Sequence, residues 1–305
     1  MNEFRLTTPV VFMIFNRPEN TRQVFERIRA ARPGRLLVVA DGPRADHPED
    51  NEKCSEARAM TEMVDWDCEV MRNYTPTNLG CKRRISSGID WAFSLVDETI
   101  VLEDDCLPHP SFFRYCSELL DRYRNDERVV AISGDNFQFG RQWTDDSYYF
   151  SRYPHAWGWA TWRRVWRHYD VAMKSWPQAQ SEGWINQIFD DPRVADYWNC
   201  NFQSVYEGRI DTWDHQWTYA CLRLNGLTAL PRVNLISNIG FGAGATHTIR
   251  SSKFSRMPVE ELQFPLQHPS DVTRLIAADR HTDQQNYSPG LFSRARRMLR
   301  RWLRD

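Results

Sequence analysis

Residues 99–105 read Thr-Ile-Val-Leu-Glu-Asp-Asp, an apolar run that ends directly in three acidic residues. A short continuous apolar run is typical of a strand that is buried on both faces of a parallel sheet. Three adjacent carboxylates repel one another unless a cation neutralises them. The stretch therefore predicts a buried strand with an acidic turn that binds Mg²⁺ or Mn²⁺ together with a diphosphate. A solvated acidic turn is the alternative interpretation.

Three further strands precede this one and alternate with helical patterns. The expected strands are 10–15, 36–40 and 68–71, and the expected helices are 18–30, 50–63 and 82–96. Such alternation predicts right-handed crossovers and an α/β fold with a mostly parallel sheet flanked by helices. Ligands bind such sheets at the carboxyl ends of the strands. We therefore expect Asn16-Arg17, Asp41-Gly42 and Glu103-Asp104-Asp105 to face one crevice.

The second half of the chain is rich in aromatic residues. After an expected helix at 110–124 and a strand at 129–132, residues 140–247 read as aromatic-rich loops and short helices, including a helix at 162–169. Ten of the 13 tryptophans lie between Trp143 and Trp217. Tryptophan packs in cores and also stacks on sugars or bases, so both interpretations stay open.

Composition excludes several classes of protein. The 305 residues hold 39 Lys and Arg against 40 Asp and Glu, and this balance argues against a surface that wraps nucleic acid. An apolar share of 41% excludes a largely disordered chain. We find no run of 18 apolar residues and expect no membrane-spanning helix and no signal peptide. The seven cysteines lack metal-site spacing, which favours free thiols in a reducing compartment.

The last fifteen residues form a separate pattern. Apolar side chains recur at helical spacing in residues 291–305, and six arginines fill the other face. With one aspartate the segment carries a charge of +5. This pattern predicts a basic amphipathic helix that lies on an anionic membrane surface. A helix packed on the protein's own body or on a partner is the alternative.

Taken together, the motifs resemble those of the GT-A glycosyltransferases, which bind a nucleotide sugar through an acidic motif after a strand. The chain looks most like the N-acetylglucosaminyltransferase I branch, whose motif is also Glu-Asp-Asp, and like bacterial glycosyltransferases of surface-polysaccharide clusters. Eight blocks in order carry the resemblance over residues 8 to about 250: VVFMIFNRP (10–18), VVADG (38–42), NLGCKRRISSG (78–88), VLEDDCLPHP (101–110), SGDNF (133–137), HAWGWATW (155–162), WDHQW (213–217) and SNIGFGAGATH (237–247).

The resemblance implies a donor site at the strand ends. Asp105 would be the metal ligand, and Asp104 would bond the ribose or orient the metal shell. Asn16 and Arg17 would lie against the base and the diphosphate. Asp41, followed by Gly42, would accept a hydrogen bond from the uracil N–H. Each residue also has a purely structural interpretation. Asn16 would cap a helix, Arg17 would lie on the surface and Asp41 would belong to a turn.

Three more donor-site residues follow from the resemblance. Asn78 would be a donor contact within an Asn-x-Gly turn that ends at Gly80, and Arg84 after this turn would reach the diphosphate. Lys82 and Arg83 crowd the same place, and a solvated basic helix face is the alternative. His247 follows a glycine-rich segment and would be a second metal ligand or a phosphate contact, with a surface histidine as the alternative.

The resemblance also implies the catalytic and acceptor residues. Asp214 would deprotonate the acceptor hydroxyl, with His215 and the more remote Asp211 as alternatives. The purely structural alternative for Asp214 is a helix N-cap beneath packed aromatic side chains. Trp157, Trp159 and Trp162 would line the acceptor side of the site, where aromatic faces can stack on sugar rings. Trp213, next to Asp214, would also contact the acceptor.

These expectations combine into one functional hypothesis. The chain would be a metal-dependent, inverting glycosyltransferase that moves a sugar from a UDP-sugar to a saccharide or lipid-linked saccharide, with Mn²⁺ or Mg²⁺ as cofactor. Residues 1–135 would form the nucleotide-sugar-binding half and 136–250 the acceptor-binding half of one GT-A domain. An extension (251–290) and the basic helix (291–305) would follow, and the protein would be cytoplasmic and peripheral on the inner membrane face.

Two rival hypotheses remain open. A sugar nucleotidyltransferase would use the same sheet, but it needs a glycine-rich phosphate loop after the first strand, where Asn16-Arg17-Pro18 has no glycine. A non-enzymatic membrane-binding protein would use the basic tail alone and would leave the acidic triplet unexplained.

Overall fold

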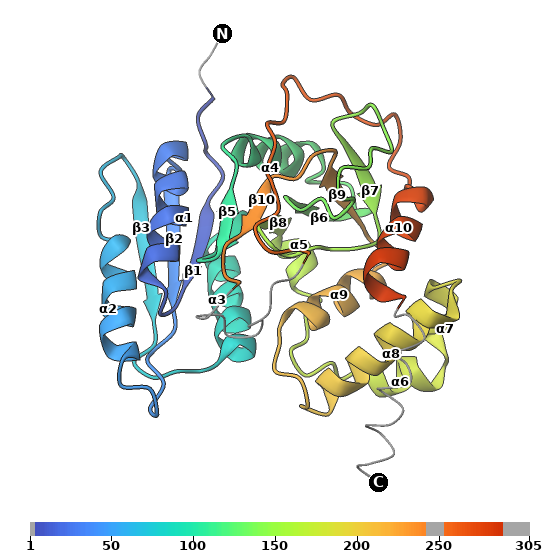
Figure 1. Ribbon diagram of the computed structural model, residues 1–305, viewed down its shortest axis with the longest axis horizontal. Helices are drawn as coiled ribbons and strands as arrows, with labels where there is room; N and C mark the ends of the chain where they lie inside the picture. The colour runs from blue at the N-terminus through green and yellow to red at the C-terminus, as the bar shows by residue number, and fades with distance from the viewer. Residues whose placement is uncertain (1–3, 242–252, 289–305) are drawn as a thin grey trace.

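An eight-stranded sheet with helices packed on it forms the centre of the computed structural model, which describes residues 4–241 and 253–288 (Figure 1). Its strands are β1 (Val10–Ile14), β2 (Arg35–Ala40), β3 (Glu69–Tyr74), β4 (Glu98–Glu103), β6 (Val129–Ser133), β7 (Tyr148–Ser151), β8 (Trp159–Trp162) and β9 (Leu227–Pro231). They lie in the order β3-β2-β1-β4-β8-β6-β9-β7. Four of the seven pairings are parallel, which confirms the predicted α/β class with a mostly parallel sheet.

The parallel half of the sheet contains the first four strands. β1 lies between β2 and β4, and Val10 is level with Leu36 on one side and Ile100 on the other. All five residues of β1 are buried because both of its faces are covered. The crossover helices are α1 (Pro18–Ala31), α2 (Asp50–Met60) and α3 (Cys81–Leu95), close to the predicted ranges. This register places the loops after β1, β2 and β4 at one edge of the sheet.

Helix α3 approaches the sheet closely at a glycine. A Cβ on Gly88 would lie 2.5 Å from Cγ1 of Val39 in β2, so this contact requires the absence of a side chain. We expect Gly88→Ala to destabilise the protein by about 1–2 kcal/mol, because overpacking outweighs the better helix propensity of alanine. Urea unfolding would measure the change.

Two further variants control this prediction. Gly34→Ala meets nothing within 4 Å and should change the free energy of unfolding by less than about 0.5 kcal/mol. In a Val39→Ala background, Gly88→Ala should cost less than it does alone. An equal cost in both backgrounds would contradict the packing explanation.

The expectation of loops and short helices for residues 140–247 is wrong at several strands. β8 lies antiparallel between β4 and β6 in the middle of the sheet. The predicted helix at 162–169 is therefore wrong at its start, because Trp162 ends β8 and the helix is only α5 (Arg163–Trp166). All four residues of β8 are buried, so it lacks the polar alternation that marks a half-exposed strand.

Most tryptophans of the second half pack in cores. The helices α6 (Trp176–Ser181), α7 (Trp184–Ile188), α8 (Pro192–Tyr206) and α9 (Asp214–Arg223) gather at the lower right of Figure 1. They enclose a second hydrophobic cluster that contains Trp176, Trp198 and Phe202. Aromatic residues therefore supply much of the core of this part of the molecule.

The last described elements close over the far edge of the sheet. Helix α10 (Ile276–Thr282) and a π-helical turn (Asp283–Tyr287) follow a long irregular segment. Asp279 of α10 accepts hydrogen bonds from Ser151 Oγ and the Arg152 backbone at the end of β7. Of the helices in the described ranges, none is long and apolar enough to cross a bilayer. The predicted basic helix at 291–305 lies outside the described residues.

Candidate active site

The acidic triplet stands at the carboxyl end of β4, where the sequence predicts it. Arg17, from the turn after β1, places its Nη1 2.8 Å from Oδ2 of Asp105 and 3.5 Å from Oδ1 of Asp104. Asp104 also accepts a hydrogen bond of 3.1 Å from the backbone N–H of Phe15. The Arg17 ion pairs and the hydrogen bond from the Phe15 backbone therefore connect the turn after β1 with the turn after β4.

The triplet crowds three carboxyl groups into a largely buried place. Burial raises the pKa of Asp104 to about 7, with Arg17 opposing the shift and Asp105 adding to it. Burial, together with Asp105, Asp104 and Asp214, raises the pKa of Glu103 well above its ordinary value. Like charges that are crowded in this way are stabilised by a nearby cation.

A second, two-stranded sheet brings Gly240 into close contact with Asp105. β5 (Cys106–Pro108) directly follows the triplet and pairs antiparallel with β10 (Ile236–Asn238). The N–H of Ile239 donates to the backbone carbonyl of Asp105 at 2.8 Å. A Cβ on Gly240 would lie 2.2 Å from Oδ2 of Asp105, so only glycine allows the chain to pass this carboxylate.

The carboxylate oxygens of the acidic triplet suit a divalent cation whose remaining ligands come from a substrate. Asp105 is one-fifth exposed and offers hard oxygen ligands beside a concentration of negative charge. In the described ranges, no group of three or more His, Cys, Asp and Glu side chains is placed to hold a metal by itself. Magnesium sites that serve phosphates commonly use one or two carboxylates and complete the shell with phosphate and water oxygens. The residues fit a metal of this kind, whereas the predicted second ligand, His247, lies outside the described residues.

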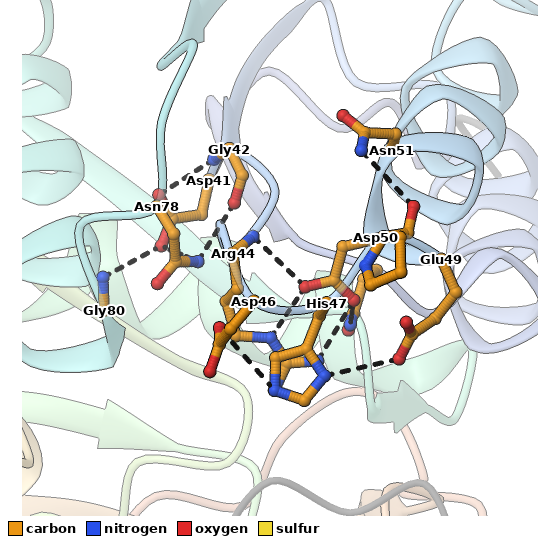
Figure 2. A network of polar contacts seen from close by, with 12 residues as sticks. Asp41, Gly42, Arg44, Asp46, His47, Glu49, Asp50, Asn51, Asn78 and Gly80 are labelled. Carbon is orange, nitrogen blue, oxygen red and sulfur yellow. Dashed lines mark hydrogen bonds and ion pairs between the residues drawn. The ribbon is translucent and has the colours of Figure 1, made fainter.

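Asp41, at the end of β2, organises a turn. Its Oδ1 accepts from the backbone N–H groups of Gly42 and Leu79 and from the Thr75 hydroxyl, at 2.9–3.1 Å. Its Oδ2 accepts from Asn78 Nδ2 at 3.0 Å and from the N–H of Gly80 at 3.2 Å. Asp41 and Asn78, both predicted donor contacts, therefore bind each other, as Figure 2 shows.

A second polar network, which the sequence analysis missed, lies beside this turn (Figure 2). The fully buried carboxylate of Asp50 accepts from Asn16 Nδ2 at 2.6 Å and from two guanidinium nitrogens of Arg44 at 2.6 and 3.0 Å. The hydrogen bonds from Arg44 hold the pKa of Asp50 well below its usual range. Asp50 begins α2 inside an acidic run, so nothing in the local sequence distinguishes it from the exposed acids around it.

Arg84 donates its hydrogen bonds to the end of β3. It is buried, and its Nη2 donates to the backbone carbonyl and the side-chain oxygen of Asn73 at the end of β3. Burial lowers the pKa of its guanidinium. The structure therefore does not bring Arg84 together with Arg17 and Asp105.

Asp214 comes from a distant part of the chain and lies near the triplet, because its charge contributes to the raised pKa of Glu103. It is the first residue of α9, and its side chain is half exposed. The covered half of the Asp214 side chain favours a higher pKa through desolvation, but hydrogen bonds from His215 and Thr212 outweigh this effect and hold the pKa below the ordinary value. The carboxylate is thus ionised near neutral pH, as a general base requires.

The start of α3 shows that these carboxylates lie together. Burial raises the pKa of the Cys81 thiol, and Glu103, Asp214, Asp211 and Asp105 raise it further. A Cβ on Gly80, which has a φ of +79°, would lie 3.4 Å from Oδ2 of Asp211. Carboxylates from the end of β4, from the turn before α9 and from the first residue of α9 therefore lie near the start of α3.

The predicted acceptor tryptophans differ in exposure. Trp159 and Trp213 are buried and stack on each other at 5.7 Å, within a core group that includes Trp217, and Trp162 is buried as well. Trp157 is half-buried and contacts Phe137 and Phe241 edge-on. Of the four, Trp157 is the one with appreciable exposed surface.

A buried histidine beside this aromatic group gives a pH prediction. Burial lowers the pKa of His155 to about 3, below an ordinary value of 6.5. Its contribution to stability is present above pH 6.5 and is lost as pH falls toward 3, because the unfolded chain takes up a proton first. The free energy of unfolding should lose about 1.4 kcal/mol per pH unit in this window through His155.

Urea titrations at several pH values would measure that slope. His155→Met should flatten it, whereas His168→Gln, at an exposed histidine, should leave it unchanged. An unchanged slope in His155→Met would contradict the assignment.

No protein-family profile matches the chain. It is 28% identical over 137 residues to an alpha-1,3-mannosyl-glycoprotein 2-beta-N-acetylglucosaminyltransferase of Arabidopsis thaliana. The match covers 41% of this chain and 30% of the relative, so the chain spans under one third of that protein.

Two solved structures align with parts of the chain at low identity. One is a UDP-glucose pyrophosphorylase in complex with UDP-glucose, 9% identical, with 74% of this chain and 90% of that chain covered and a TM-score of 0.40. The other is a mannosyltransferase of Pyrobaculum calidifontis in complex with GDP-Man and Mn²⁺, 12% identical, with 73% of each chain covered and a TM-score of 0.38. Over 137 residues, then, the chain is similar in sequence to a glycosyltransferase of the N-acetylglucosaminyltransferase I type, as its motifs predict.

Proposed function

We propose that this protein is a metal-dependent, inverting glycosyltransferase that moves a sugar from a UDP-sugar to a saccharide hydroxyl. The observation that carries the proposal is that Arg17 contacts Asp105 at the carboxyl edge of the sheet, while Asp214, from a distant part of the chain, lies near enough to Glu103 to raise its pKa. The sequence similarity to an N-acetylglucosaminyltransferase supports the same reaction class.

The donor half of the site would hold a nucleoside diphosphate. Asp105 would hold the metal together with diphosphate oxygens, and Arg17 already lies 2.8 Å from Asp105, within reach of a phosphate. When bound, Mn²⁺ or Mg²⁺ supplies Lewis-acid neutralisation of the departing diphosphate. The Asp41 and Asp50 networks would fix the loops that border the base and the ribose.

The acceptor half would centre on Asp214. Its ionised carboxylate takes the proton of the acceptor hydroxyl while the acceptor oxygen forms a bond to the anomeric carbon. The bond from that carbon to the diphosphate breaks, and its electron pair leaves on the diphosphate. One base on the face opposite the leaving group is sufficient for such an inverting displacement. Trp157 would border the acceptor, which we take to be a saccharide, free or lipid-linked.

Nucleotide binding tests the donor site directly. Thermal unfolding is followed with UDP, GDP, CDP and dTDP, each with Mn²⁺ and with EDTA. UDP at about one hundred times its Kd should stabilise the protein by about 2.7 kcal/mol, and this stabilisation should require Mn²⁺. If none of the four nucleotides shifts the transition with Mn²⁺, the donor site is wrong.

A second assay distinguishes transfer of the sugar to an acceptor from transfer of the nucleotidyl group to pyrophosphate. The protein is incubated with UDP-sugars and a panel of acceptor saccharides, or with UDP-sugars and pyrophosphate. Release of UDP that depends on the acceptor supports the proposal. Release of UTP that depends on pyrophosphate would show a nucleotidyltransferase instead.

A further inference from the structure

Two side chains hold one oxygen of the Asp214 carboxylate. The hydroxyl of Thr212 donates a hydrogen bond to Oδ1, and Nδ1 of His215 lies 2.9 Å from the same atom. Both partners come from the short turn that starts α9, so the carboxylate is oriented by its own neighbours in sequence. No side chain of the described residues donates to Oδ2.

This arrangement determines the hydrogen on the His215 ring. An ionised carboxylate only accepts hydrogen bonds, so Nδ1 of His215 is the nitrogen that carries the hydrogen. The ring centroid of His215 lies 5.9 Å from that of Trp198, which is buried in the second hydrophobic cluster. His215 is about one-fifth exposed, so packing and the hydrogen bond together restrict its rotation.

We propose that Thr212 and His215 are positioning residues that orient Asp214 so that its Oδ2 meets the acceptor hydroxyl. This inference rests on the proposed function, in which Asp214 is the base. His215 stabilises the ionised carboxylate and does not itself take the acceptor proton. A small rotation of a catalytic group costs a large part of the rate, so loss of either partner reduces kcat.

Conservative variants separate positioning from proton transfer. His215→Asn keeps an N–H donor near the place of Nδ1 but has no base, whereas His215→Ala has neither. Thr212→Ser keeps the hydroxyl, whereas Thr212→Val removes it at similar volume. We expect kcat to fall about tenfold to a hundredfold in His215→Ala and Thr212→Val. The conservative variants should stay within about threefold of the wild type, with the Kd for UDP and Mn²⁺ unchanged in all four.

His168→Ala, at an exposed histidine, is the matched control and should leave kcat and KM unchanged. If His215→Asn loses as much activity as His215→Ala, His215 is the base and the proposal is overturned. The proposal is also overturned if none of the four variants changes kcat.

A measurement that needs no turnover distinguishes this inference from the proposed function. In ¹⁵N NMR of the labelled protein, the His215 ring should show hydrogen on Nδ1, and Asp214→Ala should abolish that preference. Hydrogen on Nε2 in the wild type would overturn the inference. Absence of transfer by the wild type with every donor and acceptor would instead contradict the proposed function.

Discussion

Asp214→Asn is expected to lower kcat about a thousandfold, because the amide keeps the shape of the carboxylate but cannot accept the acceptor proton. The Kd for UDP and Mn²⁺ should stay within about threefold of the wild-type value, since the proposed mechanism places Asp214 on the acceptor side. Steady-state transfer assays and calorimetric titration would measure the two quantities.

The control for this prediction is Asp67→Asn, at a fully exposed carboxylate at the opposite end of the sheet, which should behave as wild type. A loss of nucleotide affinity as large as the loss of kcat would show that Asp214 belongs to the donor site. Nearly normal kcat in Asp214→Asn would exclude Asp214 as the base.

Asp105→Ala should have an equally large effect through a different quantity. Without this carboxylate the metal would lose its protein ligand, so nucleotide binding and transfer should both fail. We expect kcat/KM to fall by a factor on the order of a thousand, equivalent to about 4 kcal/mol of transition-state stabilisation. The Mn²⁺-dependent thermal stabilisation by UDP should disappear as well.

The variant also changes a structural ion pair, because Arg17 loses its 2.8 Å contact with Asp105. Asp105→Asn keeps an oxygen near Arg17, and a comparison of the two variants in urea separates folding from metal binding. If Asp105→Ala retained full transfer in the presence of Mn²⁺, the proposed role of the metal would be wrong.

The first half of the fold could be predicted because its signals are local. Apolar runs of four to six residues between amphipathic helices gave β1, β2, β4 and α1–α3 within a few residues. The acidic triplet could be placed at a strand end for the same reason. Arg17 and Asp105 then meet because adjacent parallel strands end at one edge.

The second half was harder because buried aromatic strands lack a polar face. Trp159 and Trp162 lie in β8, in the middle of the sheet, yet the sequence of this strand is equally compatible with a short helix or a loop in the core. The pairing of β8 with both β4 and β6 depends on residues about sixty and about thirty positions away. No window of sequence contains that information.

By itself, the sequence determined the α/β class, the positions of the polar loops and the identity of the acidic triplet. These features depend on periodicity and on the chemistry of neighbouring residues. The tertiary structure alone decided which polar groups are already bonded to each other. Asp41 binds the 78–80 turn, Asp50 binds Asn16 and Arg44, and Asp214 lies near Glu103 with Oδ1 held by Thr212 and His215. Most of these contacts join residues far apart in the chain, and folding forms them only when burial of the sheet brings the loops together.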